Sequence, residues 1–335
     1  MTASDTRRLR LDHRSGPSSP ITTCIETTTM HNMLLQERVC PVCGSSDWSR
    51  LLAESNFRPE ALNGLTFASR KTPEYMHWQL NLCKRCDLAY ADPAPSPEAL
   101  WALYEQSDFD SAIEARYASA TYARFLPSIL RRLPDKKLAV DIGTGEGAFL
   151  TELVAAGFDE VMGIEPSSAP IAAADPAVRP LIRQEVFREN TLASESASLI
   201  TCFQTIEHLN DPLAFCKDAW RALKPGGALF LIGHNRRAVS ALLMGRKSPI
   251  YDIEHLQLFS RKSMRLLVQA AGFTQVSVMA IRNRYPISYW ARLAPFPAAA
   301  KTRLLDTLRS STLGWLALAL PAGNLATVCF KTCTD

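Results

Sequence analysis

The most regular pattern of apolar and polar positions lies between Lys137 and Glu165, in the sequence KLAVDIGTGEGAFLTELVAAGFDEVMGIE. A short apolar run, 138–142, is followed by a glycine-rich turn and then by apolar residues at helical spacing that end at Gly157. A second apolar run, 161–164, stops at Glu165. This order predicts a strand, a glycine turn, a helix, a second strand and an acidic residue at its tip.

Apolar runs farther along the chain predict five more strands, at 180–182, 198–203, 228–232, 273–281 and 325–330. Residues at helical spacing separate most of them, and two helical segments, starting at Ser96 and Tyr117, precede the first strand. Strands that alternate with helices form a mainly parallel sheet that is covered on both faces. We therefore predict an α/β fold with a Rossmann-like seven-stranded sheet.

Residues 286–322, between the last two strands, are apolar and predict a mostly helical insert. The run from Leu313 to Leu320 is too short to span a membrane and is interrupted by Pro321. A lid, a homodimer face and a lipid-facing surface are all compatible with it. Burial in the core is the interpretation we favour.

The composition narrows the class of protein. The chain has 335 residues, 47% of them hydrophobic, and a net charge of +4, which is too mild to predict binding to nucleic acid or to a membrane surface. Residues 1–36 are rich in Ser, Thr, Arg and Pro without periodicity, so we expect them to be disordered. They contain no apolar core of a secretory signal, and we expect a reducing, cytoplasmic setting.

Four of the nine cysteines form two C-x-x-C pairs, Cys40 with Cys43 and Cys83 with Cys86. Two such pairs direct four thiolates at one ion, a closed tetrahedral site that favours structural zinc and leaves no position open for catalysis. Four unliganded buried cysteines and a redox dithiol are the alternatives. The 39 residues between the pairs exceed the usual spacing of a zinc ribbon.

The glycine turn fits two ligand classes. Gly143, Gly145 and Ala148 loosely match the dinucleotide pattern G-x-G-x-x-G/A, whereas Asp141 and the three glycines through Gly147 fully match D-x-G-x-G-x-G, the pattern of a nucleoside-sulfonium site. An acid at the end of the first strand suits the ammonium group of such a ligand. A carboxylate at position 165 can hold both hydroxyls of a ribose. A tight turn without a ligand is the alternative.

Candidate catalytic groups follow the fourth predicted strand, in the sequence QTIEHL. Ligands bind at the carboxyl ends of strands in open α/β sheets, so Glu207 and His208 are placed near a bound ligand. His208 or His255 is a candidate general base, because the pKa of histidine lies near neutrality. Glu207 could orient His208 or cap the next helix, and a structural role for each histidine stays open.

The segments VDIGTGEG, GIEP, CFQTIEHLNDP, LKPGG and HLQLFSRKSMRLLVQAAGF together resemble the class I S-adenosylmethionine-dependent methyltransferases, nearest to the ubiquinone-type O-methyltransferases. The resemblance covers about residues 117–282 and the last strand. The segment CPVCG…CKRCDLAYADPAPSPEAL is similar to the zinc-binding module that precedes this domain in sugar and polysaccharide-cluster methyltransferases.

The resemblance implies a role for each matching residue. Asp141, Gly143, Gly145 and Gly147 would line the methionine end of S-adenosylmethionine, and Glu165 would hold its ribose. The adenine would lie between Val186 and Phe187. The order of strands also places Phe187 there, with ordinary packing of its side chain as the alternative. Gln204 would close the pocket near the sulfonium. Relatives with E-x-x-E-H bind a divalent metal, but Gln204 stands here in place of the first acid.

These observations predict a disordered segment (1–36), a zinc module (37–95) and a methyltransferase domain (96–335) with the insert at 286–322. The predicted reaction is methylation of a small-molecule acceptor, a hydroxyl of a sugar, nucleotide-sugar or natural-product intermediate. An RNA methyltransferase with the zinc module as reader, a non-catalytic scaffold and a nicotinamide enzyme are the alternatives. The module lacks a dense Lys/Arg stripe, so we expect no nucleic-acid partner.

Overall fold

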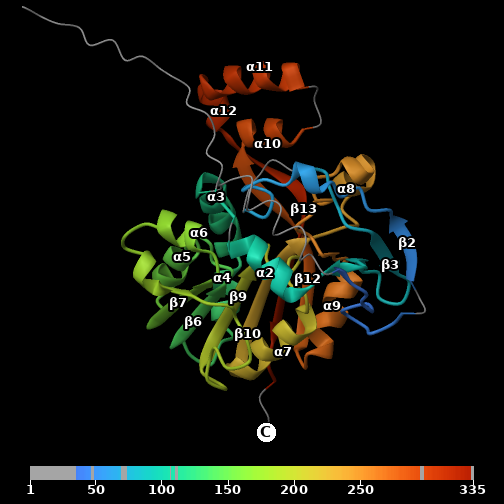
Figure 1. Cartoon of the computed structure of the whole chain (residues 1–335). Coiled ribbons are helices and arrows are strands. Elements are labelled where there is room, and N and C mark those ends of the chain that lie inside the picture. Colours follow the sequence, from blue (N-terminus) through green and yellow to red (C-terminus); the bar gives the residue numbers. More distant parts are fainter. Residues whose placement is uncertain are drawn as a thin grey trace, which may run out of the picture.

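The computed structural model describes residues 35–46, 49–68, 74–105, 107–109, 112–294 and 298–332. The predicted disorder of residues 1–36 therefore falls almost entirely outside the described residues. Figure 1 shows a large twisted sheet with helices on both sides, a smaller sheet beside it and a group of helices at one end.

The large sheet has seven strands in the order β12-β13-β10-β9-β6-β7-β8. Their bounds are β6 Leu138–Ile142, β7 Glu160–Glu165, β8 Ile182–Gln184, β9 Ala197–Phe203, β10 Leu223–His234, β12 Thr274–Pro286 and β13 Ala317–Phe330. The strands from β10 to β8 are parallel, whereas β13 runs antiparallel to both β10 and β12. The predicted α/β fold with a seven-stranded sheet is confirmed.

The third and seventh predicted strands begin at other residues than the sequence predicts. Residues Arg179–Leu181 form a 3-10 turn, η2, so the third strand begins at Ile182 rather than at Pro180. Strand β13 begins at Ala317, inside the segment that the sequence predicts to be helical, because residues 317–320 pair with 283–286 beyond a register shift in β12.

Alternate residues of the strands enter two apolar cores on opposite faces of the sheet. Val140 and Ile200 face one core, and their neighbours Ala139 and Leu199 face the other. The first core is covered by α7 (Pro212–Ala222) and α9 (Arg261–Ala270), and the second by α4 (Leu126–Leu130) and α5 (Leu150–Ala155). This period of two places helices on both faces, as predicted.

The remaining helices lie at the edges and ends of the sheet. They are α2 Pro97–Glu105, α3 Ala112–Ala123, α6 Ser168–Ala173, α8 Val239–Met244, η3 Gly245–Lys247, α10 Ile287–Leu293, α11 Ala298–Arg309 and α12 Thr312–Trp315. Among the described helices, none has the length and hydropathy needed to span a bilayer.

A second, antiparallel sheet has four strands in the order β11-β4-β3-β2. Three come from the cysteine-containing segment, β2 Ser49–Ala53, β3 Leu80–Cys83 and β4 Ala89–Ala91, with the turn η1 at Pro59–Ala61. The fourth, β11 Gln257–Leu258, comes from the large domain, and β1 Leu35–Gln36 pairs with β5 Ala94–Pro95. The predicted module at 37–95 therefore shares a sheet with residues of the predicted 96–335 domain.

The expectation that the apolar run Leu313 to Leu320 is buried is wrong. Leu313, Trp315 and Leu316 keep 56%, 57% and 59% of their side-chain surface exposed. At this end β12 and β13 extend as a two-stranded ribbon away from the helices that cover the sheet (Figure 1), and within the described part of the chain these side chains stay largely uncovered.

Candidate functional site

The glycine turn follows β6 directly and brings backbone close to a large cavity. Gly143, Gly145 and Gly147 all have a positive φ, of 70°, 57° and 79°. A Cβ at Gly143 would lie 2.3 Å from the Thr205 hydroxyl, and a Cβ at Gly147 would lie 2.5 Å from Val178. Apart from its chain neighbours, no described residue has an atom within 4 Å of a Cβ at Gly145, which lines the cavity. At that position glycine leaves room for a ligand to approach the backbone.

Asp141 is buried behind this turn and is not among the cavity-lining residues. Its two carboxylate oxygens accept hydrogen bonds from Thr201 Oγ1 at 2.6 Å and Thr144 Oγ1 at 2.7 Å. Burial raises the pKa of Asp141 to about 6, although the two hydroxyls oppose that rise. In this structure Asp141 braces the turn, and the predicted contact with the methionine end of a cofactor stays a prediction.

Glu165 ends β7 and faces the cavity from the next strand. Its carboxylate accepts hydrogen bonds from the backbone N–H groups of Gly145 and Ser167, both at 2.9 Å. Burial raises its pKa, and these two donors lower it. The carboxylate is thus held in a fixed direction beside the glycine turn, the geometry that ribose hydroxyls require.

The two predicted adenine neighbours lie in different surroundings. Val186, in the loop after β8, lines the cavity. Phe187 instead packs edge-on against Phe215 of α7, with ring centroids 5.6 Å apart, beside the apolar core. Val186 can therefore contact a base in the cavity, whereas Phe187 acts here as part of the core packing.

Gln204 follows β9 with a φ of 52°, in the left-handed region that residues other than glycine seldom adopt. Its backbone N–H donates to Ile232 O at 2.7 Å, and its side chain donates to the Tyr122 hydroxyl at 3.0 Å. These bonds hold the side chain at the cavity wall. Unusual backbone conformations held in this way occur often at functional sites.

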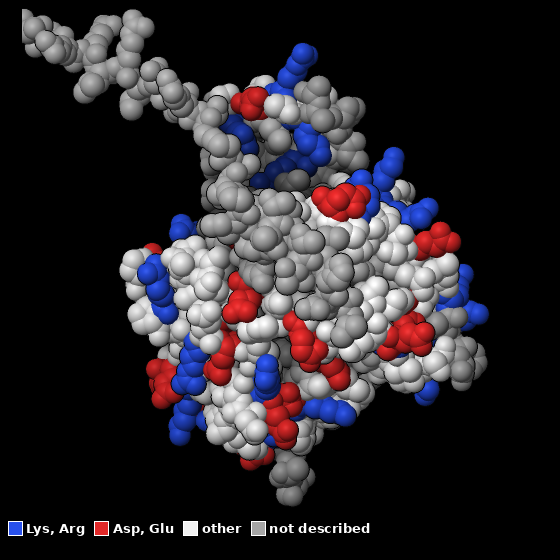
Figure 2. All heavy atoms as spheres, viewed as in Figure 1, with Lys and Arg blue, Asp and Glu red and all other residues white. Residues whose placement is uncertain are grey.

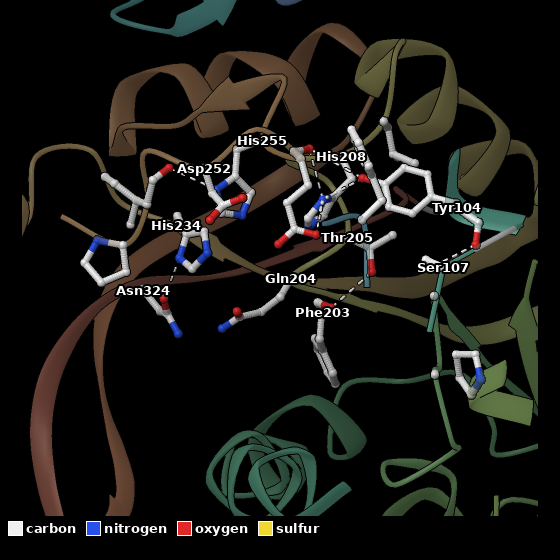
Figure 3. Close-up of a pocket in the computed structure, with 18 of the residues that line it drawn as sticks. Tyr104, Ser107, Phe203, Gln204, Thr205, His208, His234, Asp252, His255 and Asn324 are labelled. Atoms are coloured by element: carbon white, nitrogen blue, oxygen red, sulfur yellow. Dashed lines mark hydrogen bonds and ion pairs between the residues drawn. The ribbon is translucent and has the colours of Figure 1, made fainter. Parts of the chain in front are cut away.

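Three histidines line the same cavity at the carboxyl side of β9 and β10. The ring centroids of His208 and His255 are 5.0 Å apart, and those of His234 and His255 are 4.8 Å apart. Figure 3 shows these rings gathered on one side of the pocket, near Gln204. The sequence predicted His208 and His255 as candidates, and the structure brings them together.

Backbone carbonyl groups determine which ring nitrogen carries the proton in two of these histidines. His208 Nδ1 lies 3.1 Å from Glu254 O, and His255 Nδ1 lies 2.9 Å from Ile250 O. A carbonyl oxygen only accepts, so Nδ1 is the protonated nitrogen of each neutral ring and Nε2 carries the lone pair. The Tyr104 hydroxyl, 2.9 Å from His208 Nδ1, can accept from the same N–H and donates to Glu254 O.

Glu207 is fully buried and is not among the cavity-lining residues. Its Oε1 accepts a hydrogen bond from the backbone N–H of His234 at 2.5 Å, and its Oε2 has no hydrogen-bond partner among the described residues. Burial raises the pKa of Glu207 to about 7. The structure therefore places Glu207 behind the histidines and not against His208.

The four predicted cysteine ligands converge at the edge of the small sheet. Sγ of Cys40 lies 3.4 Å from Sγ of Cys86, Sγ of Cys43 lies 3.5 Å from Sγ of Cys83, and all four sulfurs lie within 4.8 Å of one another. A tetrahedron of thiolates around zinc, with Zn–S of about 2.3 Å, has edges of about 3.8 Å. The arrangement fits a four-thiolate metal site.

The cysteine cluster is attached firmly to the large domain. Asp87, next to Cys86, accepts from Arg236 Nη1 at 3.0 Å and from Arg237 Nη2 at 2.6 Å. Helix α2, which follows this segment, places Leu100, Trp101 and Tyr104 in the cavity wall. The segment around the cysteines itself contributes Phe67 to this wall.

Two contributors to this site escaped the sequence analysis. Tyr104 falls in the helix that the sequence predicts from Ser96, and nothing in its spacing indicates that it reaches His208. Glu254 could have been noted from its position beside His255 in the sequence. Together with His208 and His255 it forms a group whose potential metal-ligating atoms lie within 4.8 Å of one another.

Comparisons with known proteins locate the same region. Residues 114–278 match a family described as a methyltransferase domain. The ubiquinone biosynthesis O-methyltransferase of Pseudomonas putida is 31% identical over 113 residues, which are 32% of this chain and 48% of the relative. A probable S-adenosylmethionine-dependent methyltransferase of Mycolicibacterium smegmatis is 31% identical over 137 residues, 40% of this chain and 51% of the relative. The chain thus spans about half the length of these curated relatives.

Solved structures that match this chain include an S-adenosylmethionine-dependent methyltransferase from Thermotoga maritima, described as a possible histamine N-methyltransferase. It is 20% identical with a TM-score of 0.45, covering 66% of this chain and 93% of that one. A methyltransferase from Archaeoglobus fulgidus is 14% identical with a TM-score of 0.45, covering 65% and 98%.

Proposed function

We propose that this chain, whose residues 114–278 belong to the class I S-adenosylmethionine-dependent methyltransferases, transfers a methyl group to a hydroxyl of a small molecule. The acceptor we propose is a sugar, a nucleotide-sugar or a natural-product intermediate. One observation carries the proposal: a single cavity of about 730 Å³ is lined both by Gly145 and Glu165 and by His208 and His255. Cofactor and acceptor could therefore meet in one space.

The cavity residues around Gly145 and Glu165 fit S-adenosylmethionine. Glu165, held by two backbone N–H groups, would bind the ribose hydroxyls, and Gly145 would admit the cofactor close to the turn. Val186 would contact the adenine, and Gln204 lies where the cavity turns toward the histidines. When bound, S-adenosylmethionine supplies an electrophilic methyl group on a sulfonium.

The cavity residues around His208 and His255 are suited to bind the methyl acceptor and to take up its proton. In-line transfer needs the acceptor oxygen about 3–3.5 Å from the methyl carbon. Nε2 of His208 would take the hydroxyl proton as the O–CH₃ bond forms and the C–S bond breaks. Glu254 O and the Tyr104 hydroxyl hold the ring by its Nδ1–H, and His255 lies beside it as a second base or as a hydrogen-bond partner of the acceptor.

The cavity wall supports a hydroxylated acceptor. Asn283 is 1% exposed, lines the cavity, and its Oδ1 has no hydrogen-bond partner among the described residues. A buried amide oxygen is satisfied best by a hydrogen-bond donor, and a hydroxyl group of the methylated substrate would supply one. Two matched relatives from Pseudomonas strains are named as O-methyltransferases, which favours oxygen as the atom methylated.

We assign structural zinc to the four cysteines on the basis of their converging sulfurs. The ion would hold together the small sheet, which includes β11 of the large domain, and so support the α2 side of the acceptor cavity. The seven described cysteines are free thiols, which suits the reducing cytoplasm that we propose as its location.

A transfer assay tests the proposal. Methyl-labelled S-adenosylmethionine is incubated with the zinc-loaded protein and with separate pools of nucleotide-sugars, phenolic intermediates and total RNA. We expect label in a small-molecule pool, and roughly 10²–10⁴-fold less with His208→Gln. Label in RNA would favour the alternative reader function, and cofactor binding without transfer to any pool would favour the scaffold.

A further inference from the structure

Apolar side chains are exposed on two segments at the insert end of the molecule. Val239, Leu242 and Leu243 of α8 are 71%, 61% and 82% exposed. The segment from α12 into β13 adds five more that are between 36% and 59% exposed: Leu313, Trp315, Leu316, Leu318 and Leu320. We call these eight side chains the insert face. Exposed apolar side chains in such number commonly mark an interaction site.

Helix α8 and strand β13 meet beside the cavity. A Cβ at Gly323 of β13 would lie 3.1 Å from Ala238 Cβ, just before α8. Met244 at the end of α8 and Leu320 with Pro321 in β13 all line the cavity. Both segments of the insert face therefore adjoin residues that line the proposed acceptor site.

Basic residues accompany the insert face. Residues 239–250 and 298–320 contain five Lys or Arg and one acidic residue, Asp306, a net charge of +4. Arg246 and Lys247 follow α8 and are exposed, as are Arg303 and Arg309 of α11. Figure 2 shows blue side chains gathered over the helices at this end.

We propose that the insert face docks on the surface of an anionic phospholipid membrane. Leu and Trp side chains can enter the boundary between head groups and acyl chains while nearby Lys and Arg contact the phosphates. The contact is peripheral, since no described helix is long and apolar enough to span a bilayer.

The charge argues against a second copy of the chain as the occupant. In a two-fold symmetric dimer the same patch faces itself, so the cations of one copy would approach those of the other. An anionic surface instead attracts them. Docking would bring this part of the cavity wall close to the lipid surface, where an amphiphilic acceptor is concentrated, and this consequence alone rests on the proposed function.

Vesicle flotation with the zinc-loaded full chain tests the proposal. The probes are vesicles of pure phosphatidylcholine and vesicles of equimolar phosphatidylcholine and phosphatidylglycerol. We expect binding to the mixed vesicles that weakens with added salt, and far less binding to the neutral ones. Replacing Leu242 and Leu243 together by Gln should weaken binding about tenfold or more, because their burial in lipid is lost.

Charge variants and a matched control complete the test. Arg246→Gln and Lys247→Gln should each weaken binding to the mixed vesicles about fivefold at low salt. Val154→Gln removes an apolar side chain of α5 that is 53% exposed and lies outside the insert face, so it should bind like the parent. Zinc content and the thermal midpoint of each variant report whether it is folded.

A second readout places a single residue in lipid. Brominated phosphatidylcholine quenches tryptophan fluorescence at short range. Mixed vesicles made with this lipid should therefore quench the fluorescence of Trp315. Trp315→Phe should lose much of this quenching and still float with the vesicles through the α8 leucines. The proposal is overturned if the parent does not bind the mixed vesicles, or if the Leu242/Leu243 variant binds them as the parent does. A dimer in sedimentation that this variant dissociates would also overturn it.

Discussion

The buried carboxyl of Glu207 gives a sharp test of the electrostatics of this site. Burial raises its pKa from 4.5 to about 7, so between these pH values the folded protein holds a proton that the unfolded chain releases. Stability linked to this group is therefore greatest below pH 4.5 and falls as pH rises toward 7. The difference between the two pKa values corresponds to about 3 kcal/mol.

Glu207→Gln removes the ionisation but keeps an oxygen that can accept from the His234 N–H. The free energy of unfolding of variant and parent is measured by urea denaturation of the zinc-loaded proteins. From pH 5 to pH 8, the value for the variant minus the value for the parent should rise by about 2–3 kcal/mol. Other titrating groups cancel in this difference. Glu189→Gln, at an exposed position, should leave the difference flat. A parent-to-Glu207→Gln difference that does not change with pH would refute the reasoning.

Three further predictions concern the cavity and the metal. Alanine at Gly145 or at Gly245 places a methyl group in open space at a residue with positive φ. Each substitution should therefore lower the free energy of unfolding by about 1 kcal/mol. Only Gly145→Ala should also weaken S-adenosylhomocysteine binding, measured by calorimetry. Equal effects on binding would contradict the placement of the cofactor. Tyr104→Phe should lower kcat roughly tenfold without changing cofactor affinity, because the hydroxyl helps to hold the His208 ring in place; an unchanged kcat would remove Tyr104 from the site. Cys86→Ser should lose the zinc found by atomic absorption in the parent, and zinc retained in that variant would contradict the four-thiolate assignment.

The regular part of the fold could be predicted from the sequence because its signals are local. The apolar runs at 138–142 and 198–203 and the glycine turn each specify a strand or a turn within a few residues. The αL conformations of Gly143, Gly145 and Gly147 are of the kind that their residue type permits. Glu165 could be placed because a parallel strand fixes which end faces the ligand.

The parts that escaped prediction depend on contacts between distant segments. Tyr104 meets His208 across 104 positions of sequence, and β11 joins the small sheet from beyond residue 250. Phe187 could be placed near a base by the order of elements, but its contact with Phe215 is a matter of packing. The exposure of Leu313 and its neighbours could not be read from their hydrophobicity, which indicates burial in a core as readily as a surface that binds a partner.

The central claim, that Glu165 and the glycine turn hold S-adenosylmethionine, is tested most directly by calorimetric titration of S-adenosylhomocysteine into the zinc-loaded protein. We expect saturable binding that Glu165→Gln weakens about 10–100-fold, since a charged acceptor is lost from the ribose. Glu160→Gln, at the exposed start of the same strand, should bind as the parent does, and NADH should give no binding heat. A folded protein that binds NADH but not S-adenosylhomocysteine, or one whose affinity is unchanged by Glu165→Gln, would contradict the account.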